Sequence, residues 1–400
     1  MGRTKGLKLA SASKKLYRKI GLNLLYLVPG RVGGTEIYAR ELIRALALEA
    51  PGSEFVVFCG SEAEHSLAES GWPMNVRIVA IKLPSALKPL RILVELFWLP
   101  RLASRERVEL LHSLGTTAPL WSDCVRIVTV HDLIFHHFPT TFPRLVRAGL
   151  ELIVPQAARR SHRIHADSVA TKNDLMATYG VPADQIDVIY LGLGMSPPDE
   201  VTSERDLRSR FQLGSARIVL SVAAALVHKN INRLLEAFAE VLAGISAGEL
   251  APILIVVGHA GREQHKLNAR ARDLGIESCM RFTGWISSSD LEGLYRAATC
   301  FVYPSLFEGF GMPVLEAMQR GTAVASSSAT SLFEVAGAGA ELFDPENTRE
   351  IVAAIELLLN DDSYRQQLIA RGYIQAKKFT WQKAATETLA SYELALSTAN

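Results

Sequence analysis

The sequence predicts an α/β protein built from two Rossmann-like, doubly wound domains. The chain has 400 residues, which fits two domains of about 150–200 residues each better than one continuous core. Short β-rich runs alternate with helical stretches, and this alternation lapses once, between about residues 193 and 215. The β-rich runs are almost continuously apolar, which is typical of parallel strands buried on both faces.

The first half of the chain contains one long amphipathic helix pattern, at 35–48, directly after its first apolar run. Strands are expected at 22–28, 54–59, 76–82, 109–114, 126–132 and 186–192. Strands that alternate with helices pair in parallel, so ligand-binding loops are expected at the carboxyl edge of the sheet.

The linker is expected between about 193 and 215, where a turn-rich stretch at 192–200 is followed by charged residues without a strand signal. The pattern then restarts, with strands expected at 216–224, 252–258, 281–285, 300–305 and 322–328, and with helices over roughly 347–397. The expected division is a basic extension at 1–20, an N-terminal acceptor-side domain at 21–195, a C-terminal donor-side domain at 196–375, and a helix at 376–400 that could pack back on the first domain.

Composition excludes several classes of protein. A content of 48% hydrophobic and 21% charged residues is that of a globular chain and argues against general disorder. No apolar run reaches the roughly 18–20 residues of a membrane-spanning helix, and the richest, 83–100, is interrupted by Lys88, Arg91 and Glu95. Scattered cysteines without a CxxC pair favour reduced thiols in a cytoplasmic protein. They are Cys59, Cys124, Cys279 and Cys300.

Charge is unevenly distributed. Residues 1–20 hold seven Lys or Arg and no acid, although the net charge of the chain is only +2, which does not fit a uniformly basic nucleic-acid binder. The leader lacks the apolar segment of a secretory signal. It is either a solvated tail or an electrostatic attachment to anionic lipid at the inner face of a membrane. The second reading would use Lys14, Lys15, Arg18 and Lys19.

The densest chemical signal is the segment PSLFEGFGMPVLE at 304–316. A predicted strand ends just before it, and Pro313 suits the first turn of a new helix. Gly309 and Gly311 allow backbone N–H groups to approach a ligand closely. The N-terminus of the following helix supplies N–H donors and a positive potential, and both favour a phosphate.

Two carboxylates, Glu308 and Glu316, bracket this anion site. Beside a phosphate a carboxylate is a poor electrostatic partner, but it can accept hydroxyl protons from a sugar or a ribose. The combination favours a nucleotide sugar. In the alternative reading, Glu308 faces solvent and Glu316 only complements the helix dipole.

Six short segments, taken in order, resemble one known family. One is EGFGMPVLE, with seven residues between its glutamates; the others are Gly33-Gly34-Thr35-Glu36, Val130-His131-Asp132, Lys229-Asn230, Phe282-Thr283-Gly284 and Ser331-Leu-Phe-Glu334-Val335. Together they resemble the retaining glycosyltransferases of family 4, which have the GT-B fold and an active site in the cleft between two domains. The resemblance covers nearly the whole chain after residue 20.

The resemblance implies transfer of a sugar from a nucleotide diphosphate sugar, with retention of the anomeric configuration. Glu316 would hold the ribose hydroxyls and Glu308 the hydroxyls of the transferred sugar. Lys229 would pair with the leaving diphosphate, and His131 would lie beside the reacting centre. The donor-binding residues that it implies are Gly33, Gly34, Lys229, Asn230, Glu308, Gly309, Phe310, Gly311, Met312 and Glu316.

The resemblance is greatest to bacterial mannosyltransferases acting on polysaccharide or lipid-linked acceptors. A hexose is therefore the expected sugar, with mannose as one candidate and GDP-mannose as its donor. Trp72, Trp98 and the segment 135–138 offer aromatic surface for an acceptor, but core or loop packing is the favoured interpretation of all three.

The chemistry of the residues agrees with these roles. Negative charge builds on the diphosphate as its bond to the sugar breaks, and a fixed cation such as Lys229 stabilises it. Gly33 and Gly34 do not match GxGxxG, so a nicotinamide or flavin site is rejected; they fit a close approach to the diphosphate or an ordinary turn. Glu36 serves either the site or the first turn of its helix.

No metal is expected. The segment HDLIFHH at 131–137 lacks both the HExxH spacing and a helix to carry it, and the chain contains no DxD pair. A lysine and the helix dipole would supply the positive charge in place of a metal ion. The histidines that invite a metal interpretation are His131, His136, His137, His162 and His165.

Two departures from the family pattern reduce the number of cationic side chains expected to bind the diphosphate. Many members carry Gly-Arg six and five residues before the lysine, where this chain has Ala223 and Ala224. A subgroup has arginine directly before the lysine, where this chain has His228, and Arg233 is only a conceivable substitute. The alternative function is therefore a catalytically weak or inactive GT-B protein that binds a sugar nucleotide or scaffolds a partner.

Overall fold

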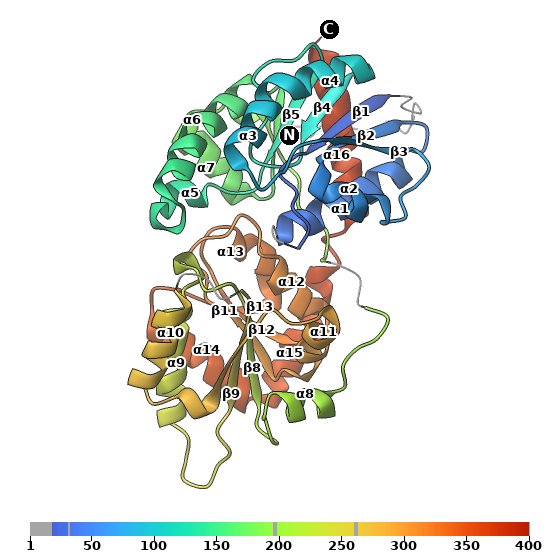
Figure 1. Cartoon of the computed structure of the whole chain (residues 1–400). Coiled ribbons are helices and arrows are strands. Elements are labelled where there is room, and N and C mark those ends of the chain that lie inside the picture. The colour runs from blue at the N-terminus through green and yellow to red at the C-terminus, as the bar shows by residue number, and fades with distance from the viewer. Residues whose placement is uncertain (1–17, 31–32, 195–197, 260–262, 400) are drawn as a thin grey trace, which may run out of the picture.

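The computed structural model describes residues 18–30, 33–194, 198–259 and 263–399. Two α/β domains stack on one another, and Figure 1 shows the N-terminal domain, in blue to green, above the C-terminal domain. Every strand pair of both sheets is parallel. The predicted fold class, two doubly wound Rossmann-like domains, is thus confirmed.

The N-terminal sheet has seven strands in the order β3-β2-β1-β4-β5-β6-β7. They are β1 (Lys19–Leu24), β2 (Glu54–Gly60), β3 (Val76–Ile81), β4 (Leu110–Ser113), β5 (Val125–Val130), β6 (Arg163–Ala166) and β7 (Ile186–Val188). The helices around it are α1 (Gly34–Glu49), α2 (Ser61–Ala68), α3 (Lys88–Leu93), α4 (Leu99–Glu106), α5 (Ile134–His137), α6 (Arg144–Arg160) and α7 (Val169–Tyr179), with a π-helical turn at Val94–Trp98 between α3 and α4.

Strand β1 begins at Lys19, three residues before the expected start at 22. Ile20 is fully buried and pairs in register with Phe55 and Leu110. Lys19 is only partly buried, and its ammonium forms an ion pair with the Glu54 carboxylate at 3.3 Å. The proposed extension at 1–20 therefore ended too late, because residues 19 and 20 belong to the sheet, while residues 1–17 lie outside the described part of the chain.

The C-terminal sheet has six strands in the order β10-β9-β8-β11-β12-β13. They are β8 (Ile218–Val222), β9 (Ile253–Val257), β10 (Met280–Gly284), β11 (Cys300–Tyr303), β12 (Ala323–Ser327) and β13 (Ala340–Phe343). The helices of this half are α8 (Glu204–Arg210), α9 (Ile231–Ala243), α10 (Gln264–Asp273), α11 (Ser288–Ala297), α12 (Met312–Gln319), α13 (Ser331–Ala336), α14 (Thr348–Asn360) and α15 (Asp362–Ala376).

Two short strands, β6 and β13, have no counterpart among the expected strands. Both carry charged or polar residues, such as Arg163 and His165 in β6 and Glu341 in β13, where a continuous apolar run was expected. Arg163 forms an ion pair with Asp187 of the neighbouring β7, so polar residues fit this edge of the sheet. The expected linker is also less irregular than its composition suggested, because it contains α8.

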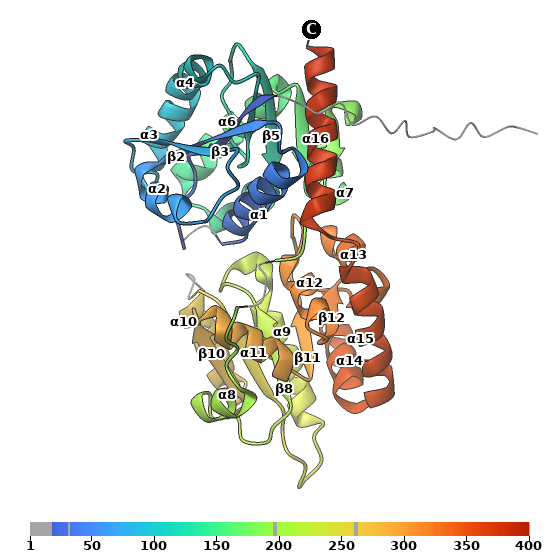
Figure 2. The ribbon, with the colours of Figure 1, turned by 90° about the vertical axis from the view of Figure 1, so that its right-hand side faces the viewer.

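The last helix, α16 (Trp381–Thr398), packs against α1 of the N-terminal domain. Figure 2 shows it running alongside the upper domain, far from the sheet that precedes it. Small buried residues, Ala384, Ala385 and Ala395, allow the close packing. The chain thus crosses between the domains twice, and the Trp381 indole N–H bonds the carbonyl of Leu193 at 2.5 Å, so the two crossings lie together.

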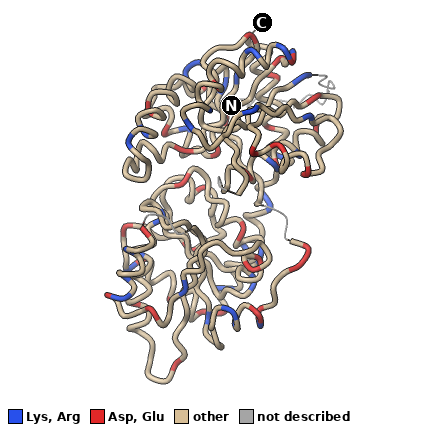
Figure 3. Tube along the Cα trace, in the orientation of Figure 1, with Lys and Arg blue, Asp and Glu red and all other residues tan. Residues whose placement is uncertain are grey.

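Charges of both signs are interspersed over both domains, as Figure 3 shows. Within the described residues, no helix combines the length and the apolar character needed to cross a membrane.

Candidate active site

Residues predicted from both halves of the chain meet where the domains touch. Gly309 lies against His131: a Cβ on Gly309 would sit only 1.9 Å from the His131 carbonyl oxygen, so no other residue fits there without movement. The Thr171 hydroxyl lies 3.3 Å from the His131 carbonyl and 3.4 Å from that of Gly309. The glycine-rich segment of the C-terminal domain is therefore held directly against the N-terminal domain.

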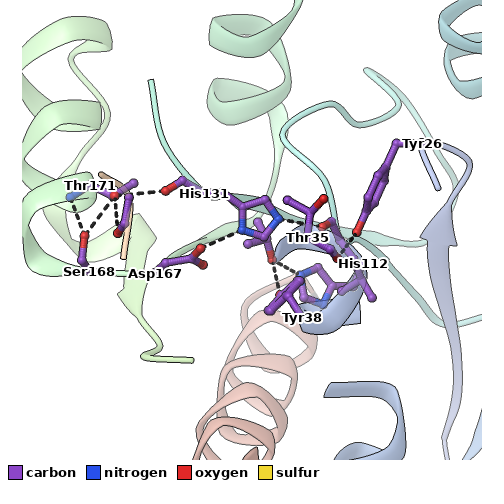
Figure 4. Close-up of polar contacts among 11 residues, drawn as sticks. Tyr26, Thr35, Tyr38, His112, His131, Asp167, Ser168 and Thr171 are labelled. Carbon is purple, nitrogen blue, oxygen red and sulfur yellow. Dashed lines mark hydrogen bonds and ion pairs between the residues drawn. The ribbon is translucent and has the colours of Figure 1, made fainter. Parts of the chain in front are cut away.

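His131 follows β5, and its imidazole is held on both sides (Figure 4). Nδ1 lies 2.7 Å from a carboxylate oxygen of Asp167, and Nε2 lies 3.0 Å from the carbonyl of Leu114. Both partners are acceptors, so the ring satisfies both only when it is doubly protonated. Burial lowers the pKa of His131, but the Asp167 carboxylate outweighs burial, and the pKa lies above its ordinary value of 6.5.

On the C-terminal side, Lys229 and Glu308 form a buried ion pair of 2.6 Å. The Tyr303 hydroxyl donates to the same Glu308 oxygen at 2.9 Å, and the Lys229 ammonium also donates to Tyr303 at 3.1 Å. Lys229 ends a short 3-10 turn after β8, Tyr303 ends β11, and Glu308 opens the loop before α12. Three neighbouring segments at the carboxyl edge of one sheet therefore build this cluster.

The two members of the pair hold each other charged. Burial raises the pKa of Glu308, but the Lys229 ammonium outweighs burial and lowers it below its ordinary value. For Lys229, burial lowers the pKa, and Glu308 more than reverses the effect. The cluster therefore offers a cation whose present partner is itself one of the predicted sugar-binding groups.

Glu316 lies on α12, and the phenol of Tyr295 donates to its carboxylate at 2.9 Å. Burial raises the pKa of Glu316, although the nearby Arg320 guanidinium opposes this. Gly194 of the first crossing lies against it, since a Cβ there would be 2.2 Å from a Glu316 oxygen. The two predicted carboxylates thus differ: Glu308 is stabilised as an ion, whereas the neutral form of Glu316 is favoured by burial.

The segment before α1 reaches the C-terminal domain. A Cβ on Gly34 would lie 2.5 Å from the methyl carbon of Met312, so Gly34 touches the start of α12. Gly33 is the N-cap residue of α1 with a positive φ of 60°. Glu36 accepts from the Gly30 amide at 2.8 Å and from Arg40 at 3.0 Å, so its carboxylate closes the loop that leads into α1.

Helix α12 begins as the spacing predicted, with Gly311 as its N-cap at φ 109° and Pro313 in the first turn. Phe310 faces inward instead: it is buried and packs its ring against Phe379, with the centroids 5.7 Å apart. The Phe310 backbone carbonyl accepts from Ser331 at 3.0 Å. Its side chain therefore belongs to the packing where the chain crosses between domains.

Residues flanking Lys229 have structural partners of their own. The Asn230 amide donates to the carbonyls of Pro304 and Pro345, at 3.1 and 2.8 Å, and so ties three loops together. Burial lowers the pKa of His228 to about 4, so this residue is neutral and does not supply a second cation. Arg233, the conceivable substitute, directs one guanidinium nitrogen to Thr348 at 3.3 Å.

The histidines that suggested a metal site do not converge on one point, and three of them bond different protein groups. His137 bonds Asp174 at 2.9 Å, His165 bonds Ser391 at 2.9 Å, and His162 accepts from the Arg126 amide at 3.0 Å. A single helical turn, α5, does carry part of this segment, contrary to expectation. Among the described residues, no group of three or more His, Cys, Asp or Glu is arranged to hold a metal ion.

Sequence reasoning missed three side chains of this junction: Asp167, Tyr303 and Tyr295. Asp167 follows β6, the strand that was not expected. The sequence feature that could have pointed to Asp167 is the neighbouring Ser168, a helix N-cap residue, which accepts from the Thr171 amide at 3.0 Å at the start of α7. The two tyrosines carried no such signal, because each lies in a stretch that already fits a buried strand or helix.

A second junction lies at α13, where Glu334 reaches across to the N-terminal domain. Its carboxylate accepts from the amides of Val169 and Ala170, at 3.0 and 2.9 Å, and from the Tyr190 hydroxyl at 2.7 Å. Those amides are the first of α7 and have no partner within their own helix. The donor-side domain thus caps a helix of the other domain.

This arrangement is that of a two-domain glycosyltransferase. The family described as Glycosyl transferases group 1 matches residues 204–375, and that described as Glycosyltransferase Family 4 matches residues 32–194. The chain belongs to glycosyltransferase family 4, and the predicted resemblance is confirmed.

Individual proteins agree with this assignment. The chain is 32% identical over 276 residues to O-antigen chain mannosyltransferase B of Escherichia coli, covering 67% of this chain and 70% of the relative. Among solved structures, sucrose-phosphate synthase from Thermosynechococcus elongatus superposes with a TM-score of 0.74, at 19% identity over 95% of this chain and 100% of that one. Anabaena HepE in complex with UDP and glucose gives 0.71, at 19% identity over 94% and 100%. At that identity, the structural likeness concerns the fold.

Proposed function

We propose that the chain is a retaining glycosyltransferase that moves a hexose from a nucleotide diphosphate sugar to a glycan or lipid-linked acceptor. The observation that carries the proposal is the buried Lys229–Glu308 pair beside the glycine-rich start of α12, held against His131 of the other domain. A cation, a helix N-terminus and a polyol-binding carboxylate are the groups that a sugar diphosphate needs.

Lys229 would stabilise the departing diphosphate. When the bond between the anomeric carbon and the phosphate oxygen breaks, its electron pair stays on the diphosphate. Lys229 directs two of its three N–H donors to Glu308 and Tyr303, so the third would donate to the phosphate. The first amides of α12, which follow Gly311, would bind the same group.

The carboxylates would hold the two ends of the donor. Glu308, kept ionised by Lys229, is suited to the hydroxyls of the sugar at the reacting end. Glu316, one helical turn and more along α12, would accept from the ribose hydroxyls while Tyr295 holds its other oxygen. Gly33 and Gly34 would bring backbone from the opposite domain close to the diphosphate, since Gly34 already touches Met312.

His131 would line the acceptor side of the reacting centre. Both ring nitrogens are bonded to protein acceptors, so the imidazole is suited to act as a fixed cation and not as a free base. Retention requires that the acceptor oxygen bond to the same face of the sugar from which the diphosphate departs, or that two inversions follow each other. The proposal assigns the acceptor proton to the departing phosphate oxygen.

Mannose is the favoured hexose, because O-antigen chain mannosyltransferase B is the relative that is 32% identical. GDP-mannose is accordingly the first donor to test, and UDP-glucose the second, because HepE was solved with UDP and glucose. We further propose that no metal is required, since Lys229 and α12 supply the positive potential, and that the enzyme works at the cytoplasmic face of a membrane.

The experiment is a panel of GDP-, UDP- and ADP-sugars, assayed for nucleoside diphosphate release with and without EDTA, followed by NMR of the product's anomeric proton. The expected result is release from one donor, unchanged by EDTA, with the donor's anomeric configuration retained. Loss on chelation that Mg²⁺ restores would overturn the metal-independent site. Tight donor binding without turnover would favour the alternative, a sugar-nucleotide-binding or scaffolding protein, which Ala223, Ala224 and His228 motivate.

A further inference from the structure

The helical segment 88–106, made of α3, the π-helical turn and α4, presents an apolar face to the outside. Leu90, Leu93, Phe97 and Trp98 recur at the spacing of one helix face, and each is between 44% and 55% exposed. Figure 2 shows α3 and α4 on the side of the N-terminal domain that faces away from α16. Trp98, for which packing was expected from the sequence, is instead one of the exposed aromatic residues.

These side chains form one continuous surface. Leu93, Val94, Phe97, Trp98 and Arg101 line a common shallow groove. Trp121, from the loop before β5, is 40% exposed and extends the surface, because the Arg101 guanidinium lies 5.3 Å from its ring centre. Contiguous exposed apolar surface of this kind on a folded domain usually marks an interaction site.

The rim of this surface is basic. Arg101 and Arg105 lie over the rings of Trp121 and Trp98, at 5.3 and 5.9 Å, so both guanidinium groups border the apolar groove. None of the described ion pairs involves Arg101 or Arg105, and Lys88 at the start of α3 is likewise exposed without one. The rim therefore carries net positive charge toward solvent.

The acidic residues of the segment are neutralised or turned away. Glu95 is buried on the opposite face, where it accepts from Asn23 at 2.7 Å and from Thr117 at 2.8 Å. Glu106 is paired with Arg77. Asp123, next to Trp121, is exposed and accepts from Ser104. One acid therefore stands at the edge of a surface that is otherwise basic.

The opposite face fixes the orientation of the segment. Leu99, Ala103 and the Glu95 carboxylate are all buried against the sheet, so the segment cannot rotate its apolar side inward without exposing them and leaving Glu95 unpaired. The apolar face is thus a permanent outer surface of the fold.

We propose that this surface docks the enzyme on an anionic membrane. Leu and Phe would enter the boundary between headgroups and acyl chains, and Trp98 and Trp121 would sit at headgroup level, where indole rings are favoured. The arginines on the rim would meet the phosphates of anionic lipids, whose negative surface potential attracts basic side chains. Charge complementarity is the reason to prefer a lipid surface over a protein partner.

Docking here would bring the acceptor side of the site near the membrane. The loop after β4 contacts both: Thr117 donates to Glu95 of the docking segment, and the Leu114 carbonyl accepts from His131. A lipid-linked acceptor would therefore reach the junction from the surface that holds it. This last consequence rests on the proposed function, whereas the docking itself does not.

The test is co-sedimentation of the full chain with vesicles of phosphatidylcholine, alone or mixed with phosphatidylglycerol. Leu93→Ser should weaken partitioning onto mixed vesicles about tenfold. Leu250→Ser is the matched control: Leu250 is 56% exposed against 53% for Leu93, but lies in the other domain, and its loss should change nothing. Arg101→Gln together with Arg105→Gln should weaken binding and reduce its salt dependence.

Two further measurements separate the competing explanations. Brominated lipid should quench tryptophan emission of the wild-type chain, and Trp98→Phe should remove part of that quenching. Deletion of residues 1–17, which stops short of β1, tests the basic leader independently. Equal binding by wild type, Leu93→Ser and the double arginine variant would overturn the proposal, as would sedimentation showing that a second copy of the chain covers the surface. None of these readouts needs donor turnover, so failure of the proposed function leaves them interpretable.

Discussion

The two domains each bury a charged pair at their junction, but the pairs differ in what surrounds them. His131 is held by Asp167 and by the Leu114 carbonyl, all within the N-terminal domain, so its ring is fixed before any ligand arrives. Lys229 is held by Glu308 and Tyr303, and both Lys229 and Glu308 are predicted to bind the donor. In the N-terminal pair both ring nitrogens of His131 are therefore already bonded within the protein, whereas the proposed function requires Lys229 and Glu308 of the C-terminal pair to bind the donor as well.

This difference predicts which substitutions change catalysis and which change protonation and stability. Groups that bind the donor should affect turnover strongly. Groups that are already satisfied should act mainly through pKa values, through the free energy of unfolding and through the fit between domains.

Lys229→Ala should cause the largest loss. It removes the cation from the departing diphosphate, and loss of one such electrostatic group costs about 100- to 1000-fold in kcat. Donor affinity should fall less, because charge on the diphosphate is greatest in the transition state. Single-turnover rates and donor Kd, measured on the same preparation, separate the two effects.

The matched control is Lys266→Ala, since Lys266 also pairs with a glutamate, Glu263 at 2.9 Å, but on the surface. That variant should keep wild-type turnover. If kcat of Lys229→Ala falls by less than about threefold, another residue stabilises the departing diphosphate, and the contrast between the domains does not hold.

Glu316→Gln should weaken donor binding by about 10- to 100-fold, because the ribose hydroxyls lose a charged acceptor. The pH dependence sharpens this prediction. Burial raises the pKa of Glu316, so the carboxylate is lost as pH falls through a value above its ordinary 4.5, and donor affinity should fall with it. In Glu316→Gln, affinity should no longer change over that range.

Glu341→Gln provides the comparison for Glu316, because Tyr364 donates to Glu341 much as Tyr295 donates to Glu316, in the same domain. Calorimetric titration with the active donor at several pH values would show the difference. Equal affinities for wild type and Glu316→Gln would take Glu316 out of the donor site.

The contrast between the domains also explains how far the sequence could predict the site. Glu308, Gly309 and Glu316 lie in one segment whose pattern is local in the chain, and Lys229 was named through the family resemblance, which also rests on short local segments. Asp167 could not be placed in this way, because β6 lacks an apolar run. Nε2 of its buried His165 bonds Ser391 of α16, which is 226 positions away.

The same reasoning applies to the ends of elements. At the start of β1, Lys19 and Ile20 pair in register with Glu54 and Phe55 of β2, and Lys19 also forms an ion pair with Glu54, although its charge made it look like part of the basic extension. The outward face of segment 88–106 depends on Asn23 and Thr117, which hold Glu95 on the inner side. Partners distant in sequence decide these features, and the local pattern does not contain them.

Asp167→Asn should lower the pKa of His131, because burial then acts without the opposing carboxylate. The raised pKa of the wild-type histidine means that the pair contributes fully to the free energy of unfolding below 6.5, and that this contribution is lost as pH rises through the raised value. The stability difference between wild type and variant should thus be largest below pH 6.5 and shrink as the pH rises through the raised pKa of His131.

Chemical denaturation at several pH values, with histidine resonances followed by NMR, would measure both quantities. Asp174→Asn is the matched control, because Asp174 pairs with His137 at a more exposed position of the same domain. If Asp167→Asn leaves the His131 pKa unchanged, the imidazole is not held as a cation, and the N-terminal pair is not the fixed structure inferred above.

Glu334→Gln should have the smallest effect, since it changes how the domains fit together and leaves both charged pairs intact. The carboxylate caps the first amides of α7, where a negative charge stabilises the helix by about 0.3–1 kcal/mol. A glutamine keeps the size and one acceptor oxygen but loses the charge, so a two- to fivefold drop in kcat is expected, with faster hydrogen exchange at Val169 and Ala170. Glu350→Gln is the control, because Glu350 caps the Asp344 amide within one domain at 2.7 Å and should leave kcat unchanged. Faster exchange without any change in kcat would show that the α13–α7 contact only stabilises α7, and that the other contacts between the domains, such as Gly309 with His131 and Gly34 with Met312, are enough to align them.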